Sequence, residues 1–122
     1  MPSIRVVFYR DRDGTSPILD WLESLPTRAQ DKCMVRIERL RQLGHELRPP
    51  EADYLRDGIC ELRARHAGVR YRMLYFFHER TIAVVAHAIQ KQRASVPKQA
   101  IALALWRKAA FVRAPRLHTY EN

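Results

Sequence analysis

Three strand-like runs follow one another in the second half of the chain, separated only by short turns. The runs span residues 59–65, 69–77 and 81–90, and they are rich in β-branched, aromatic and alternating side chains. Ala67-Gly68 and His78-Glu79-Arg80 lie between them as turn segments. Connections this short join antiparallel neighbours. The sequence therefore predicts an antiparallel meander around which the rest of the chain has to pack.

Two amphipathic helices are expected between a first strand, over residues 3–8, and the meander. Ser16-Pro17 is a good start signal, because Ser is a favoured N-cap and Pro loses no needed hydrogen bond at the first helical position. Pro26 ends that helix. Thr27–Gln30 is a capping box that begins the second helix, and Gly44 ends it. We expect the pair to form a helical hairpin on one face of the sheet.

A short strand over residues 53–55 and a C-terminal helix over residues 98–112 complete the expected elements. The tail from Arg113 onward is expected to be loosely held. Runs of strands and helices, rather than strict alternation, predict an α+β fold with a mostly antiparallel sheet. We expect one domain over residues 1–122, ordered over about 3–112. The apolar stripe of the last helix is predicted to contain Ile101, Leu105, Ala109 and Val112, with Trp106 beside it.

The positive charge of the chain lies in its second half. Residues 1–60 hold ten basic and ten acidic side chains, whereas residues 61–122 hold twelve basic and three acidic ones. The formal net charge of +9 therefore comes from the half that contains the meander. Arginines interleaved with tyrosines on neighbouring strands are typical of proteins that bind RNA or DNA phosphates. The plain alternative is a basic domain whose arginines are solvated.

Four arginines are expected to share one face of the first hairpin of the meander. Side chains alternate along a strand, so Arg63 and Arg65 share a face and can meet Arg70 and Arg72 across the hairpin. Like charges directly opposite one another destabilise a sheet, so this face needs a counter-charge. Glu61 and a bound phosphate backbone are the two candidates. For any one arginine a solvated charge is the simpler interpretation, whereas the cluster as a group favours function.

Further cations follow the last run. Lys91 and Arg93 precede the helix that begins at Lys98, and a loop between a strand end and a helix N-terminus is a common place for anion contacts. An ordinary polar loop is the alternative. His87 interrupts the apolar run and is expected to share a face with Val85 and Ile89. Its unperturbed pKa near neutrality suits acid–base work, although a satisfied core histidine is the more common explanation.

Several function classes have little support. Cys33 and Cys60 stand far apart, and no histidine spacing matches a metal site. The chain has no glycine-rich nucleotide loop, no nucleophile elbow and no paired carboxylates, so we expect no metal or other cofactor. The N-terminal apolar stretch is too short for a signal peptide, and no segment approaches the roughly 20 apolar residues of a membrane helix. We expect a cytoplasmic protein with no membrane partner.

The order and spacing of five segments resemble the RelE/HigB toxin superfamily, and specifically its phage-derived HigB-like branch. The family patterns run roughly P-x-x-x-[FW]-L-x-x-L-P, L-x-G-[IL]-x-E-L-R, Y-R-x-x-Y, H-x-[FI]-x-K-K and T-P. The resemblance covers nearly all of residues 3–112. In this chain the segments are Pro17–Pro26, Leu55–Arg63, Tyr71–Tyr75, His87–Gln92 and Val96-Pro97.

The resemblance implies a fold, an activity and a partner. The fold is RelE-like: a small antiparallel sheet with two helices after the first strand. The protein is expected to be the toxin of a type II toxin–antitoxin pair, an endoribonuclease that cleaves mRNA on the ribosome, usually in the A site, and so inhibits translation. Its expected partner is a cognate, HigA-like antitoxin with a helix-turn-helix domain.

The family's functional residues carry over onto matching positions. Arg63 matches the arginine of E-L-R, Arg72 that of Y-R-x-x-Y, and Lys91 the first lysine of K-K. Gln92 departs from the pattern by replacing the second lysine, although Arg93 can supply that charge. A second departure, Val96 for the threonine of T-P, removes a helix cap worth about 1 kcal/mol.

These matches imply metal-free cleavage in which the ribose 2′-OH attacks the adjacent phosphorus and leaves a cyclic phosphate and a 5′-OH. Arg72 is expected to be the main stabiliser of the transition state, with Arg63 and Lys91 holding phosphates. Arginine does not readily deprotonate, so the base is Lys91, His87 or a ribosomal group. The expected RNA-binding residues are Arg65, Arg70, Arg93 and Lys98.

Two rival interpretations remain at this point. A non-enzymatic RNA- or DNA-binding module can use the same basic face, and it would show salt-dependent binding without cleavage. A degenerate toxin homologue would bind its antitoxin but cause no growth arrest.

Overall fold

A single open sheet forms the centre of the computed structural model, which describes residues 3–91 and 95–121. Within that part of the chain the sheet has six strands in the order β2-β3-β4-β5-β1-β6. The strands are β1 (Arg5–Tyr9), β2 (Ala52–Arg56), β3 (Ile59–His66), β4 (Val69–His78), β5 (Ile82–Lys91) and β6 (Thr119–Tyr120).

The predicted α+β class and the mostly antiparallel meander are confirmed. Strands β2 to β5 pair in sequence, each antiparallel to the next. Strand β1 lies beside β5 and is parallel to it, and β6 pairs antiparallel with β1. The turn between β3 and β4 places Ala67 and Gly68 at φ of 52° and 80°, a conformation in which glycine loses little. The strand boundaries predicted from such turn residues hold to within one or two positions.

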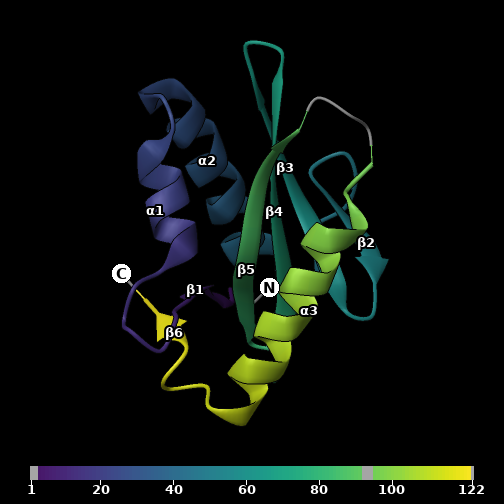
Figure 1. Ribbon diagram of the computed structural model, residues 1–122. Helices are drawn as coiled ribbons and strands as arrows, with labels where there is room; N and C mark the ends of the chain where they lie inside the picture. The colour runs from purple at the N-terminus through teal and green to yellow at the C-terminus, as the bar shows by residue number, and fades with distance from the viewer. Residues whose placement is uncertain (1–2, 92–94, 122) are drawn as a thin grey trace.

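Helices cover both faces of this sheet (Figure 1). On one face lie α1 (Pro17–Ser24) and α2 (Thr27–Leu43), followed by the short 3₁₀ turn η1 (Gly44–Glu46). Trp21 of α1 packs edge-on against Tyr71, with ring centroids 6.2 Å apart. The other face carries α3 (Lys98–Arg113), where Phe111 packs against Phe76 at 5.6 Å. Successive residues of β4 therefore point to different helical layers, as the strand period predicted.

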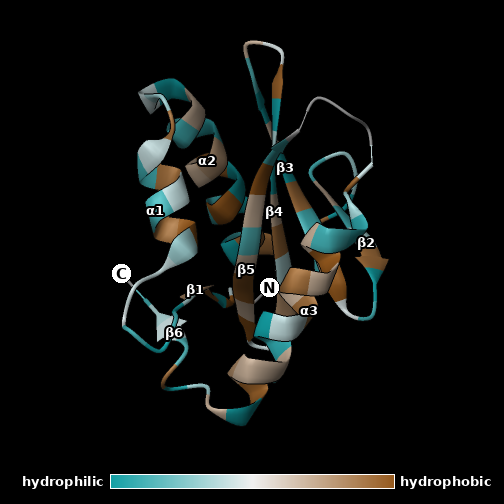
Figure 2. Cartoon of the chain, viewed as in Figure 1, coloured by the Kyte–Doolittle hydropathy of each residue, from teal (hydrophilic) through white to brown (hydrophobic). Residues whose placement is uncertain are grey.

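The core lies on both sides of the central strands. Residues from Tyr71 to Phe76 are all buried, as are those from Ala83 to Ala86, and Figure 2 shows hydrophobic residues along these strands and on the inner sides of the helices. Burying each large apolar side chain stabilises the fold by about 1.5–3 kcal/mol. No helix among the described residues is long and apolar enough to cross a membrane.

A bulge in β5 changes which residues share a face. Leu74 pairs with His87, but Tyr75 pairs with Val85, so Ala86 is an extra residue in β5. The expectation that His87 shares a face with Val85 is wrong for this reason. His87 instead lies on the α3 side with Ile89, whereas Val85 pairs with Tyr75 on the opposite side.

The helix starts partly match the prediction. Ser16 caps α1 as expected, because its side chain accepts a hydrogen bond from the Leu19 amide. The capping box at Thr27 is wrong. Pro26 is the N-cap residue of α2, and no side chain caps that end. Thr27 already lies in the first turn, because Pro26 in an extended conformation sets the helix start one residue earlier.

The C-terminal region differs from expectation in two ways. Trp106 and Val112 are exposed, at 64% and 54%, since α3 packs through Ala100, Ala104 and Phe111, and the two alanines let the helix lie close to the sheet. The tail beyond Arg113 is held in place. His118 is buried, its Nδ1 lies 2.7 Å from the Arg10 carbonyl oxygen, and its ring stacks on Tyr9 at 5.0 Å.

Candidate nucleic-acid interface

The strand register arranges the candidate residues in three rows across β3, β4 and β5, on the face that α3 partly covers. Residues opposite one another in a sheet share a face, so each row is a set of neighbouring positions. From the hairpin tip inward, the rows are Arg65–Arg70–Lys91, Arg63–Arg72–Ile89 and Glu61–Leu74–His87. We call them the outer, middle and inner rows. The predicted gathering of four arginines on one face of this hairpin is confirmed.

Glu61 neutralises the middle row. Its Oε1 accepts a hydrogen bond from Arg63 Nε at 2.8 Å and another from Arg72 Nη1 at 3.0 Å. Glu61 and Arg72 are 2% and 5% exposed. Two arginines opposite one another would repel, and the shared carboxylate offsets that repulsion in a poorly solvated place. Glu61, one of the two counter-charges that the sequence suggested, is therefore a counter-charge in the structure.

Hydrogen bonds and ion pairs hold Arg63 in place although its side chain is only half-buried. The hydrogen bond to Glu61 raises the pKa of its guanidinium, and Asp53 of β2 lies 3.2 Å from Nη2. Behind it, Arg36 of α2 donates from Nε to the Arg63 carbonyl oxygen at 2.8 Å, and its Nη1 lies 3.3 Å from Glu51. These bonds fix the backbone and the side chain of Arg63 together.

The outer row has a different character. Arg65 is exposed and Arg70 is half-buried, and neither side chain forms a hydrogen bond or an ion pair with any residue that the structure describes. Lys91 is the last residue of β5 and lies opposite Arg70 in the register. A hollow of about 420 Å³ borders the outer and middle rows. Its lining includes Arg36, Pro50, Ala64 and Tyr71 beside the four arginines.

His87, in the inner row, is half-buried and faces α3. Burial lowers the pKa of its imidazole, and the charge of Arg107 lowers it further. Arg107 Nη1 lies 3.4 Å from His87 Nδ1. The sequence did not point to Arg107, because the stripe of α3 that packs on the sheet, which joins Ala100, Ala104 and Phe111 and passes through position 107, is not the stripe that was predicted.

Two other candidate residues remain, Arg93 and Lys98. Arg93 is outside the described residues. Lys98 is exposed at the first position of α3, and none of the side-chain bonds found in the described residues joins it to the three rows. Nor do the described residues contain a group of three His, Cys, Asp or Glu side chains able to hold a metal ion.

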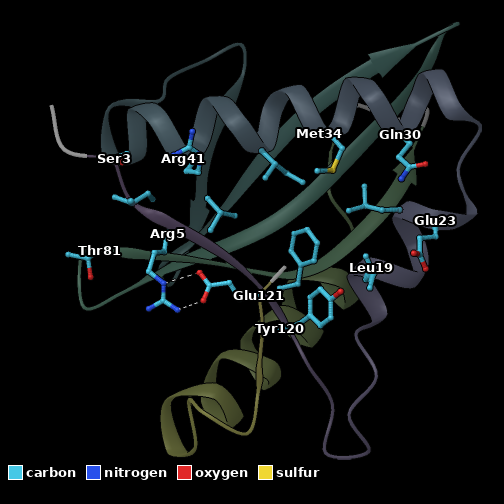
Figure 3. Close-up of a pocket in the computed structure, with 15 residues that line it drawn as sticks. Ser3, Arg5, Leu19, Glu23, Gln30, Met34, Arg41, Thr81, Tyr120 and Glu121 are labelled. Atoms are coloured by element: carbon cyan, nitrogen blue, oxygen red, sulfur yellow. Dashed lines mark hydrogen bonds and ion pairs between the residues drawn. The ribbon is translucent and has the colours of Figure 1, made fainter.

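A larger hollow lies on the other side of the sheet (Figure 3). It has a volume of about 800 Å³ and lies between β1 and the helices α1 and α2. Its floor is apolar, and Arg5 and Glu121 form an ion pair at its rim. None of the predicted RNA-site residues whose side chains the structure describes lines it.

A comparison with models of protein families gives a match over most of the chain. The family model described as "Phage derived protein Gp49-like (DUF891)" matches residues 20–109. This span includes all three rows and most of α3. A comparison with curated proteins gives no match.

Proposed function

The chain belongs to the Gp49-like family of phage-derived proteins, a RelE- and toxin-like family, and from that premise we propose that it is the toxin of a type II toxin–antitoxin pair that cleaves mRNA on the ribosome. In this proposal the protein acts in the cytoplasm, has a RelE-like fold of the HigB branch, and is held inactive by a HigA-like antitoxin with a helix-turn-helix domain. The observation that carries the activity is the stack of basic rows on β3, β4 and β5.

The proposed reaction uses no metal. The ribose 2′-OH attacks the adjacent phosphorus, its proton passes to a base, and the bond from phosphorus to the 5′-oxygen breaks. The products are a 2′,3′-cyclic phosphate and a 5′-OH, which takes up a proton. Negative charge accumulates on the non-bridging oxygens on the way, and fixed cations stabilise it most when they need not reorganise.

Two groups of residues from the outer and middle rows supply different parts of this chemistry. Arg65 and Arg70 of the outer row, whose charges no described residue neutralises, bind the mRNA backbone, with Arg93 and Lys98 extending this contact. Arg72, Arg63 and Lys91 stabilise the phosphorane. The bonds to Glu61 hold Arg72 and Arg63 in one geometry, which lowers the reorganisation needed at the moment of reaction. The ribosome positions the mRNA, which a site without a catalytic triad requires.

One observation favours a second candidate function. Arg72 is buried against Glu61, so part of its charge is compensated before RNA arrives. A non-enzymatic RNA-binding module needs the outer row alone and is compatible with a middle row that serves stability. A toxin homologue that retains only antitoxin binding fits the same observation.

Cleavage on programmed ribosomes separates these candidates. The parent protein is compared with Arg72→Ala and Arg72→Lys, and the ends of the RNA fragments are identified chemically. Because Arg72→Ala leaves Glu61 facing Arg63 alone, circular dichroism checks that each variant is folded. The proposal expects cleavage by the parent to leave a cyclic phosphate and a 5′-OH, with at least about a hundredfold loss in folded Arg72→Ala. Tight binding without cleavage by the parent would favour the RNA-binding module.

A further inference from the structure

His87 and Arg107 form a contact that limits what the histidine can do. Arg107 lies in α3, and its Nη1 donates to the Ala86 carbonyl oxygen at 2.8 Å while lying 3.4 Å from His87 Nδ1. Ala86 is the extra residue of the β5 bulge, where the ladder is interrupted and a side-chain donor can reach the backbone. The bulge thus serves to anchor Arg107 beside His87.

The surroundings hold the Arg107 guanidinium in this place. The Cζ atom of Arg107 lies 5.4 Å from the centre of the Tyr9 ring, and that ring stacks in turn on His118. Arg107 Nε is buried and has no hydrogen-bond partner in the described residues. A guanidinium between an aromatic face and a bulge carbonyl has few alternative rotamers.

A guanidinium has N–H donors and no acceptor, so it can meet the imidazole only at a nitrogen that carries a lone pair. The contact therefore selects the tautomer in which Nδ1 is the acceptor and Nε2 carries the proton. Protonation of Nδ1 would set two donors against each other. Other charged groups face this side of the sheet at other positions: Arg72 is one row away on β4, Glu61 lies two strands away in the same row, and Lys108 of α3 lies over the Phe76 ring, 5.8 Å from its centroid.

We propose that Arg107 is a positioning residue for His87, fixing its proton on Nε2 so that His87 meets the RNA phosphate as a hydrogen-bond donor and not as the base that deprotonates the 2′-OH. This inference rests on the proposed function where it concerns RNA. It removes His87 from the three candidate bases and leaves Lys91 or a ribosomal group. It also gives α3 a role in the site, because Arg107 lies on this helix.

Nitrogen-15 NMR tests the contact without any activity measurement. Long-range proton–nitrogen spectra of the labelled protein, recorded from about pH 5 to 8, report the tautomer and titration midpoint of His87. The parent should show the Nε2–H tautomer and a midpoint below the ordinary value of about 6.5. In Arg107→Ala the tautomers should mix and the midpoint should rise, because both the donor and the charge are gone, while the burial that lowers this pKa most should keep it below about 6.5.

Two further variants complete this measurement, one as a second test and one as a control. Arg107→Gln keeps an amide donor but no charge, so the Nε2–H tautomer should persist while the midpoint rises; it also carries the test if Arg107→Ala does not fold. Lys108→Ala removes a neighbouring cation that bonds the Asp57 carbonyl oxygen and does not contact His87, so His87 signals should not change. A parent His87 with its proton on Nδ1, or a midpoint that neither Arg107 variant moves, would overturn the proposal.

Cleavage assays test the role toward RNA. Glutamine can place an amide N–H near the position of Nε2, so His87→Gln should retain about tenfold more cleavage than His87→Ala. Equal loss in both variants would indicate that His87 acts as a base and would contradict the proposal. Absence of cleavage by the parent would remove the proposed function itself, whereas the spectra would still decide whether Arg107 fixes the tautomer.

Discussion

Replacing Glu61 with Gln is expected to destabilise the protein strongly, because this carboxylate is the shared counter-charge of the middle row. It is 2% exposed and accepts hydrogen bonds from Arg63 Nε at 2.8 Å and Arg72 Nη1 at 3.0 Å. Glutamine keeps the size and one acceptor oxygen but removes the negative charge. Two guanidinium groups then face each other across β3 and β4, that of Arg72 buried and that of Arg63 about one-third exposed.

The size of this effect follows from burial. Removing one partner of a buried ion pair costs about 3–5 kcal/mol. Asp53 still lies 3.2 Å from Arg63 and compensates for part of the loss, so we expect the lower end, about 3 kcal/mol. For a domain of this length, about 1 kcal/mol corresponds to about 4 °C, which predicts a fall in Tm of about 12 °C.

Thermal unfolding followed by circular dichroism at about pH 7 measures this fall. Glu79→Gln is the matched control, because Glu79 is 76% exposed in its side chain and such substitutions change stability by less than about 0.5 kcal/mol. Glu61→Met combined with Arg72→Met should recover part of the lost stability, since no uncompensated charge remains from that pair. A Tm for Glu61→Gln within about 2 °C of the parent would show that the fold does not need Glu61 as the counter-charge of the middle row.

Three further predictions concern other parts of the molecule. Ser16→Ala removes a helix cap and a buried hydrogen bond to the Tyr9 carbonyl oxygen, so urea unfolding should show that the free energy of unfolding falls by about 1–2 kcal/mol. Thr27→Ala removes no cap and should lower it by less than about 0.5 kcal/mol, and equal losses would contradict the capping assignment. Burial raises the pKa of the Cys33 thiol from 9.0 to about 12, and a group whose pKa is raised in the folded state stabilises the fold below its unfolded value and loses that contribution as pH rises. Tm should therefore fall more steeply between about pH 9 and 12 in the parent than in Cys33→Ala, and parallel curves would show that the thiol makes no such contribution. Arg65→Ala should weaken binding to single-stranded RNA and reduce the slope of log K against log salt by about 0.7, and an unchanged slope would remove Arg65 from the phosphate contacts.

The meander could be predicted because its signals are local. Turn residues mark both ends of each strand, and the period of two settles which arginines share a face. Ala67 and Glu79 both have positive φ, and each lies at a turn that the sequence marked. The same local reasoning located Ser16 as the cap of α1.

Features that depend on packing between distant segments could not be predicted. The bulge at Ala86 shows only when β5 is aligned with β4, and it moved Val85 to the face opposite His87. The predicted stripe of α3 is right at Ile101, which is buried, and wrong at Val112, because close packing on the sheet selects alanines and leaves the far side of the helix exposed. Pairing of the two-residue β6 with β1 depends entirely on tertiary contacts.

In the candidate site, too, the features with local signals could be predicted and those that depend on packing could not. The sequence placed four arginines on one face and named Glu61 as a possible counter-charge. It did not show that Arg72 would be buried while Arg65 stays exposed, because burial depends on how the strands and helices assemble. Arg107 was missed since its partner His87 lies 20 residues away, on a different element.

Cleavage of mRNA on programmed ribosomes by the parent, an Arg65→Ala/Arg70→Ala variant and Arg113→Ala tests most directly whether the basic rows form a ribonuclease site. Neither Arg65 nor Arg70 has a side-chain partner among the described residues, so the double variant should stay folded, and Arg113 is an exposed arginine at the far end of α3 from Lys98. If the outer row binds mRNA at such a site, the parent and Arg113→Ala cleave the mRNA and the double variant does not. Equal cleavage by all three proteins, or none by the parent, would contradict this assignment.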